Sequence, residues 1–424
     1  MKVLMLGWEF PPFFAGGLGM VCYELTKALS KKDIKIDYIM AYSLGKNPHK
    51  FLNIFSADRF KVNSLNKNLN VNIEKIDTVL EPYGEYNNFK NYEDFLSSFG
   101  EILSYEEDSK KVNTKKLYGR DILHEVFLYA QRVKRLALKN DFDIIHSHDW
   151  TTLPAAIILK RITGKPFIAH VHITEYDKTG GYPGHPEIMK IEKWGWELAD
   201  KIIAVSNFTK RRLVEQYGID PNKIVVVHNG ANEMSREING ENHSIKKTNK
   251  IVLFAGRVTL QKGPEYFIKA AKKVLEYEKN VKFIVAGTGD MLPRIIELSA
   301  EYGINQNIIF HGFYTRKEAE LLFSMADVFV MPSVSEPFGI VPLEAVVKGT
   351  PTIISKQSGI SEVLENSLKV DFWDTDEMAH KIICLLRYEP LKEEIKEKAL
   401  IELDEKFNWD KTANKVIEVY KSLI

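Results

Sequence analysis

The stretch IVLFAGRVTLQKGP, residues 251–264, is the clearest strand–loop–helix unit in the sequence. Its apolar half, 251–256, has the length of a buried strand, and Pro264 begins a helical pattern that runs to Tyr277. The segment before it, 234–250, is polar without apolar periodicity, as in a linker, so an α/β pattern restarts here. Further strands are expected at 281–286, 308–311, 328–331 and 352–354.

The same alternation fills the first half of the chain. A strand at 3–7 is followed by a glycine-rich loop and a helix from about Met20 to Ser30. Such alternation predicts parallel sheets with helices on both faces. We therefore expect two doubly wound, Rossmann-like α/β lobes, 1–233 and 250–405, facing each other across a cleft. The other strands expected in the first lobe are 34–40, 143–146, 166–172, 201–205 and 224–228.

One region breaks this rhythm. Residues 46–120 are rich in Asn, Lys and aromatic residues with weak periodicity, and we interpret them as an insertion in the first lobe that shapes acceptor choice.

Composition excludes several classes of protein. The chain of 424 residues is 45% hydrophobic, which predicts an ordered protein. Its 58 Lys+Arg against 57 Asp+Glu leave almost no net positive charge that would attract nucleic acid. Two cysteines are too few for a disulfide framework, and the apolar run 3–6 is too short for a signal peptide. We expect a cytoplasmic enzyme. The basic helix expected at 124–140 could lie on an anionic membrane, but we expect it to pack on its sheet instead.

Two cations follow the strand at 251–256. Arg257 and Lys262 lie in AGRVTLQKG, just before the helix at Pro264. Both would stand at the carboxyl end of the strand, where charge-assisted hydrogen bonds neutralise a diphosphate. The alternative is a solvated loop with incidental charges.

The segment SEPFGIVPLEA, residues 335–345, carries two carboxylates. Pro337–Gly339 must turn the chain into a helix, whose free N–H groups at Gly339, Ile340 and Val341 would face an anion. Glu344, in the helix, is placed to accept ribose hydroxyls, and Glu336, before the turn, to bind sugar hydroxyls. The alternative is a capping carboxylate and a surface glutamate.

Glycines and histidines mark the first lobe. Gly16 and Gly17, in AGGLG, permit close approach of backbone to a phosphate, without the spacing of a dinucleotide fingerprint. The pairs His146/His148 and His170/His172 end predicted strands, where alternate side chains point the same way and can chelate a metal. A metal-dependent hydrolase is thus the alternative. We favour no metal, with one histidine of each pair packed and the other facing the cleft, because no further ligand set completes a shell.

Together these segments resemble the retaining glycosyltransferases of the GT-B fold, which have two facing Rossmann-like lobes. The resemblance is closest to glycogen and starch synthases and to the sucrose synthase and mannosyltransferase-like family. It covers nearly the whole chain apart from 46–120, and its most specific part combines Arg257 and Lys262 with Glu336 and Glu344. The segments that carry it are GWEFPPFFAGGLG, HSHDW, ADKIIAVSNFTK, VVVHNGAN, AGRVTLQKG, VAGTGD, FHGF, MPSVSEPFG and EAVVKGTP.

The resemblance implies roles for matching residues. Arg257 and Lys262 would bind the diphosphate of a nucleotide sugar, Glu344 the ribose, and Glu336 the donor sugar. The final helix, within 406–424, would cross back to the first lobe. The resemblance also implies that the backbone contacts the diphosphate at Gly17, Gly339 and Ile340, and that the sugar is contacted by Asp149 and His172. The base of the nucleotide would lie beside His311, Gly312 and Phe313.

The resemblance therefore predicts a hexosyltransferase without a cofactor, using an ADP-, UDP- or GDP-sugar. Glucose would pass to an oligo- or polysaccharide, as in elongation of an α-1,4-glucan. One departure bears on this, because Phe14 stands where glycogen and starch synthases of bacteria and plants carry the lysine of Lys-x-Gly-Gly-Leu. The alternatives are a small sugar, a sugar phosphate or a lipid-linked acceptor, an epimerase of the same fold, and a binding protein with an inactive site.

Overall fold

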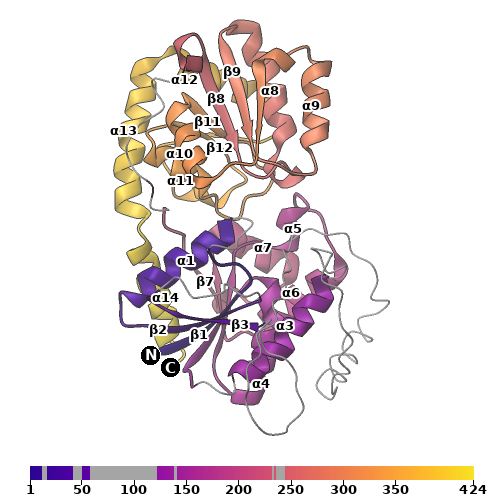
Figure 1. The fold of residues 1–424 in the computed structure, drawn as a ribbon, viewed down its shortest axis with the longest axis vertical. Coiled ribbons are helices and arrows are strands. Elements are labelled where there is room, and N and C mark those ends of the chain that lie inside the picture. The colour runs from indigo at the N-terminus through magenta and orange to yellow at the C-terminus, as the bar shows by residue number, and fades with distance from the viewer. Residues whose placement is uncertain (12–16, 42–49, 58–121, 138–140, 232–233, 235–243) are drawn as a thin grey trace.

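The computed structural model describes residues 1–11, 17–41, 50–57, 122–137, 141–231, 234 and 244–424. Two α/β lobes lie one above the other along the long axis of the molecule (Figure 1). Each contains one parallel sheet with helices on both faces, which confirms the predicted fold class. Most of 46–120, together with Phe14 and Gly16, lies outside the described residues.

The first lobe has a seven-stranded sheet in the order β3-β2-β1-β4-β5-β6-β7. Nearly every residue of its central strands is buried, because helices cover both faces. β3 lies in the stretch that we interpreted as an insertion, yet it pairs with β2 at the edge of the sheet. The strands are β1 Lys2–Gly7, β2 Lys35–Met40, β3 Asn53–Ser56, β4 Ile144–His148, β5 Phe167–Val171, β6 Lys201–Ala204 and β7 Ile224–Val226.

Two hydrophobic cores flank this sheet. Helices α3, α4 and α6 pack on one face, and α1 packs on the other together with the C-terminal helix α14. The helix expected at 124–140 is α3, and its apolar side is buried in the core. The helices are α1 Gly17–Ser30, α3 Ile122–Ala137, α4 Leu153–Thr163, α5 Glu175–Lys178, α6 Pro186–Leu198, α7 Asn207–Tyr217 and α14 Trp409–Lys421.

The second lobe has a six-stranded parallel sheet in the order β10-β9-β8-β11-β12-β13. Helices α8, α9 and α12 cover one face, and α10, α11 and α13 cover the other. Its strands are β8 Lys250–Ala255, β9 Val281–Ala286, β10 Ile308–Gly312, β11 Val328–Met331, β12 Thr352–Ser355 and β13 Leu368–Val370. Its helices are α8 Pro264–Tyr277, α9 Leu292–Glu301, α10 Arg316–Met325, α11 Val341–Val347, α12 Thr375–Arg387 and α13 Glu389–Lys406.

The C-terminal helices connect the lobes. α13 runs along the second lobe and α14 lies on the first, beside α1, so the two chain termini are neighbours (Figure 1). Trp409, Val416 and Tyr420 of α14 are buried in the same core as Val21 and Leu25 of α1. Among the described residues, no helix combines the length and the apolar character needed to cross a membrane.

Each sheet has one point at which the strand order reverses. In the first lobe it lies between β1 and β4, and in the second between β8 and β11. The chain leaves adjacent strands in opposite directions there, so the loops diverge and expose a crevice at the carboxyl ends. The loops after β4, β8 and β11 contain Asp149, Arg257 with Lys262, and Glu336.

Candidate functional site

The loop after β8 positions the two cations. Arg257 follows Gly256, and its Nη2 donates a hydrogen bond to Oε1 of Gln261 at 3.3 Å. Lys262 ends a short 3₁₀ turn, and Gly263 then has a φ of 65°. A Cβ at Gly263 would meet the carbonyl oxygen of Pro332 at 2.1 Å. Glycine is therefore required here, where the loop turns against the end of β11 and fixes Lys262 beside it.

The loop after β11 holds Glu336 against Lys262. The Nζ of Lys262 forms an ion pair with Oε2 of Glu336, which also accepts a hydrogen bond from Ser333 at 3.4 Å. Glu336 is only 7% exposed, and its backbone pairs with the segment at Ser358. Two residues singled out separately in the sequence thus meet at one point of the sheet edge.

Helix α11 begins as the sequence predicts, directly after a turn at Gly339. Gly339 has a φ of 104°, and Ile340 is the N-cap residue of the helix. Glu344 lies in the first turn and is half-buried. Burial, and secondarily the Glu344 carboxylate, raises the pKa of Tyr314 well above its usual value. Tyr314 is therefore a neighbour of Glu344 that the sequence did not reveal.

The segment expected beside the base lies at the end of β10. Gly312 has a φ of 80°, and Phe313 next to it is 77% exposed. An aromatic side chain of this size exposed beside a carboxyl edge is suited to stacking on a ring. His311 is exposed as well.

At the first lobe's edge, Asp149 fixes the chain that contains His172. Its Oδ1 accepts hydrogen bonds from the backbone N–H of His172 at 2.7 Å and of Ile173 at 3.3 Å. Burial nevertheless raises the pKa of Asp149 from 3.8 to about 7. Its φ of 56° is unusual for a residue with a side chain. Strained backbone and a near-neutral pKa in one carboxyl are typical of functional sites.

Gly17 is the first residue of α1. It is exposed, and a Cβ placed on it would meet no atom of the described residues within 4 Å. The N-terminus of α1 follows β1 at the carboxyl edge of the first sheet, where its N–H groups and dipole favour an anion.

The two histidine pairs differ from the expected arrangement. In the second pair His170 is buried and His172 is half-buried, as expected, but both His146 and His148 of the first pair are completely buried. The sequence shows each pair only within its own strand, whereas β4 and β5 are neighbours and His148 lies opposite His170. The pairs therefore form one cluster.

Polar contacts join the lobes beside this site. Ser335, next to Glu336, donates a hydrogen bond to Oδ1 of Asp177 at 2.7 Å and accepts one from Arg212 at 3.1 Å. Ser206 donates to the carbonyl oxygen of Pro337 at 2.5 Å. Loops from the carboxyl edges of both sheets are thereby held face to face. Sequence reasoning missed Asp177 and Arg212, whose only signal was their place in segments that follow strands.

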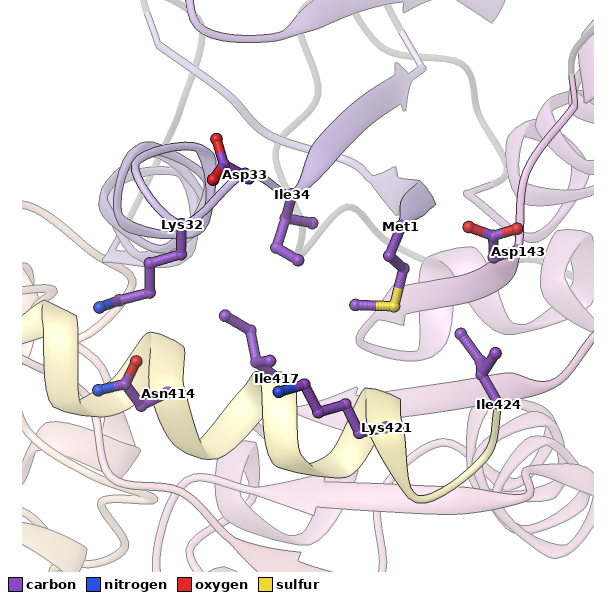
Figure 2. Close-up of a pocket in the computed structure, with 9 residues that line it drawn as sticks. All are labelled: Met1, Lys32, Asp33, Ile34, Asp143, Asn414, Ile417, Lys421 and Ile424. Carbon is purple, nitrogen blue, oxygen red and sulfur yellow. The ribbon is translucent and has the colours of Figure 1, made fainter.

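A cavity of about 740 Å³ lies elsewhere, between α14 and the first sheet. Figure 2 shows Met1, Ile34 and Ile417 pointing into it. Met1, Ile34 and Asp143 precede β1, β2 and β4, so this cavity is at the amino edge of the sheet. It is therefore distinct from the candidate site.

Comparison with known sequences finds glycosyltransferases over both lobes. The family described as "Glycosyltransferase Family 4" matches residues 96–233, and "Glycosyl transferases group 1" matches 235–401. An uncharacterised glycosyltransferase of Methanocaldococcus jannaschii is 28% identical over 99% of this chain and 98% of its own length. The uncharacterised glycosyltransferase YqgM of Bacillus subtilis is 30% identical over 60% of this chain and 71% of its own. A glycogen synthase of Mycobacterium tuberculosis is 24% identical over 86% and 80%.

Solved structures show the same fold. Sucrose-phosphate synthase from Thermosynechococcus elongatus superimposes with a TM-score of 0.74 at 17% identity, covering 100% of this chain and 98% of that one. Anabaena HepE in complex with UDP and glucose gives a TM-score of 0.64 at 16% identity, covering 100% of both chains. The shared arrangement of two facing lobes is the GT-B fold.

Proposed function

Because this chain belongs to the GT-B glycosyltransferases, we propose that it moves glucose from a nucleotide diphosphate to a carbohydrate acceptor with retention of anomeric configuration. The observation that carries the proposal is the placement of Arg257, Lys262 and Glu336 at the strand-order reversal of the second lobe. HepE, with UDP and glucose in its structure, supports this choice of donor.

The charges suit cleavage of a sugar–diphosphate bond. As the bond from the anomeric carbon breaks, positive charge grows on the sugar and negative charge on the diphosphate. Arg257 and Lys262, which come from a loop braced by Gly263, supply fixed positive charge where the negative charge develops. Preorganised charge of this kind makes the largest contribution in many enzymes. These two cations neutralise the diphosphate without a metal ion.

The ion pair between Lys262 and Glu336 prepares both groups for the donor. Without a ligand, the half-buried Lys262 ammonium and the buried Glu336 carboxylate balance each other. When the donor binds, the Lys262 ammonium turns to the diphosphate, and Glu336 accepts hydrogen bonds from the sugar hydroxyls. Glu344, in the first turn of α11, binds the ribose.

The first lobe acts on the sugar. Asp149 holds the backbone of His172 in place, and its near-neutral pKa allows it to bind hydroxyl groups without placing a full charge there at all times. Retention follows from attack on the face that the diphosphate leaves, with the diphosphate accepting the proton of the acceptor hydroxyl. No protein nucleophile is needed in that mechanism.

For the acceptor, we propose a glucan or a maltooligosaccharide. The glycogen synthase of Mycobacterium tuberculosis, matched over 86% of this chain, supports this class. A sugar phosphate is the second candidate, because the relatives include D-inositol 3-phosphate glycosyltransferases, one of them 26% identical over 72% of this chain, and because Phe14 replaces the lysine of glycogen synthases.

The test is a turnover assay with ADP-, UDP- and GDP-glucose against glycogen, maltose, glucose 6-phosphate, inositol 3-phosphate and a lipid-linked sugar. We expect one donor to yield a product with glucose attached through an α-linkage, detected by mass spectrometry and nuclear magnetic resonance. Turnover is expected to continue in chelator. Isomerised donor without transfer would indicate an epimerase, a β-linked product would exclude retention, and nucleotide binding without turnover would indicate an inactive site.

A further inference from the structure

Four imidazole rings are stacked where β4 and β5 end. Alternate side chains of a strand share one face of the sheet, and His148 lies opposite His170 in the parallel register. The centroids of His146 and His148 are 4.6 Å apart, and those of His148 and His170 are 5.2 Å apart. His172 stacks on His170 at 4.1 Å. His146, His148 and His170 have exposed fractions of 0%, 0% and 1%.

Hydrogen bonds pair some of the ring nitrogens. Nδ1 of His146 lies 2.6 Å from the hydroxyl of Tyr420 on α14, and Nε2 of His146 lies 3.2 Å from Nδ1 of His170. Nδ1 of His148 lies 2.9 Å from Nε2 of His172. The buried atoms Nε2 of His148, Nε2 of His170 and Nδ1 of His172 have no hydrogen-bond partner among the described residues.

No placement of the protons on these rings gives every buried ring nitrogen a hydrogen-bond partner. A neutral imidazole has one N–H and one lone pair. Whichever way the bonds from Tyr420 through His146 to His170 point, Nε2 of His170 remains without a partner, as a bare lone pair or as an N–H. The pair of His148 and His172 likewise leaves one lone pair and one N–H. A native core normally pairs such groups with water or an ion.

We propose that His146, His148 and His170 bind a transition-metal ion of the Zn²⁺ class. One ring nitrogen from each lies within 4.8 Å of the others. Nitrogen ligands at about 2.0–2.1 Å around a tetrahedral Zn²⁺ are roughly 3.4 Å apart, close to the 3.2 Å between Nε2 of His146 and Nδ1 of His170. With these two atoms as ligands, the third ligand is the unpartnered Nε2 of His148, so the ion satisfies that atom, while Nε2 of His170 remains an N–H.

The chemistry of the ring nitrogens selects the kind of ion. Neutral imidazole is the form that binds metal ions, and three nitrogen ligands suit Zn²⁺ better than Mg²⁺ or Ca²⁺. The half-buried His172 stacks on His170 beside the cluster.

Tyr420 provides the outer partner that such sites usually have. A histidine bound through one nitrogen donates the N–H of the other to a neighbour, which sets its tautomer. With Nε2 of His146 on the ion, Nδ1–H donates to the Tyr420 hydroxyl. The ion would thereby fix α14 to the first sheet, 274 positions away in the chain. This role is structural and independent of the proposed sugar transfer.

The experiment measures metal binding by the full chain. The protein is unfolded with chelator, refolded without metal, and titrated with Co²⁺ by visible absorption and with Zn²⁺ by calorimetry. We expect one equivalent of Co²⁺, with the spectrum of a tetrahedral nitrogen-rich site, displaced by Zn²⁺. Zn²⁺ is also expected to raise the Tm of the refolded protein. A wild-type protein that binds neither ion, or that binds them without a tetrahedral spectrum, overturns the proposal.

Matched variants locate the site. His148→Asn and His170→Asn should weaken Zn²⁺ binding by more than about 100-fold, and Tyr420→Phe, which removes only the hydroxyl, by roughly 10–100-fold. His380→Asn changes an exposed histidine on α12 and should bind as the wild type does. Equal affinity in all four variants overturns the assignment. If the asparagine variants do not refold, the Zn²⁺ affinity of Tyr420→Phe is compared with that of the wild type, and equal affinity overturns the assignment.

Discussion

The two facing sheet edges use opposite chemistry. The second lobe presents charged groups, Arg257, Lys262 and Glu336, on loops after β8 and β11. The first lobe has at its edge the half-buried His172 and Asp149, a carboxyl whose pKa burial raises to about 7. This difference fits the proposed division of roles, in which the second lobe would neutralise the diphosphate and the first would hold the sugar.

Breaking the charged edge should have the largest effect. Lys262→Ala leaves the buried Glu336 without its ion pair and removes a cation from the diphosphate. We expect a loss of about 2–5 kcal/mol of transition-state stabilisation, or roughly 30–5000-fold in kcat/KM. Steady-state kinetics with the donor identified by the screen measures it.

A double variant separates the effect of leaving Glu336 unpaired from the effect of losing the Lys262 cation. Lys262→Met with Glu336→Gln removes both charges and should recover the free energy of unfolding that Lys262→Met loses, without recovering activity. Lys356→Ala removes an exposed ion pair with Asp371 and should change stability by less than about 1 kcal/mol. Activity near wild type in Lys262→Ala would contradict the role of the charged edge.

At the edge of the first lobe, Asp149→Asn should change the pH dependence of stability. The unfolded chain releases this proton near pH 3.8, whereas the folded protein keeps it to about pH 7. Wild-type stability therefore falls as the pH rises through this window, because the folded state binds more protons. The amide of the variant would keep an oxygen for the N–H groups of His172 and Ile173 without a charge to bury.

Denaturant unfolding of wild type and Asp149→Asn at about pH 4.5 and about pH 7.5 measures the difference. The variant should gain stability relative to wild type at the higher pH, while kcat/KM falls by about 10–100-fold, as for the loss of a hydrogen bond to a charged group. Glu192, whose pKa burial also raises, affects both proteins equally. A difference in stability that is the same at both pH values would show that Asp149 is already ionised in the folded state near pH 4.5.

Weakening the contact between the two edges should have the smallest effect. Ser335→Ala removes the hydrogen bond to Asp177 and its bond from Arg212. We expect the contact between the lobes to lose about 0.5–1.5 kcal/mol of free energy. This loss should raise KM a few-fold and leave kcat little changed. Ser299→Ala, buried in α9 of the second lobe, is the control that should lower Tm and leave KM unchanged. A large fall in kcat for Ser335→Ala would instead place Ser335 in the chemical step.

The fold was readable from the sequence because both lobes consist of long apolar strands separated by periodic helices. The strands at 281–286 and 328–331 were predicted with their observed bounds. β3 and β13 were missed, since they are short edge strands with polar residues. The residues of the charged edge were identifiable because each follows a strand at its carboxyl end.

Contacts between distant segments were not readable. Lys262 and Glu336 are 74 positions apart, and only the neighbouring places of β8 and β11 bring them together. The histidine pairs were read as separate because register between β4 and β5 is a tertiary property. Tyr420 gave no signal, since its role depends on α14 lying against the first sheet.

Calorimetry of nucleoside diphosphate binding tests the difference between the edges most directly. The Kd of the nucleoside diphosphate from the preferred donor is measured for wild type, Arg257→Ala and His172→Ala at low and high salt. We expect Arg257→Ala to raise this Kd at least about 30-fold and to reduce its dependence on salt, whereas His172→Ala should leave the Kd nearly unchanged. An unchanged Kd for Arg257→Ala would contradict the assignment of the diphosphate to the second lobe.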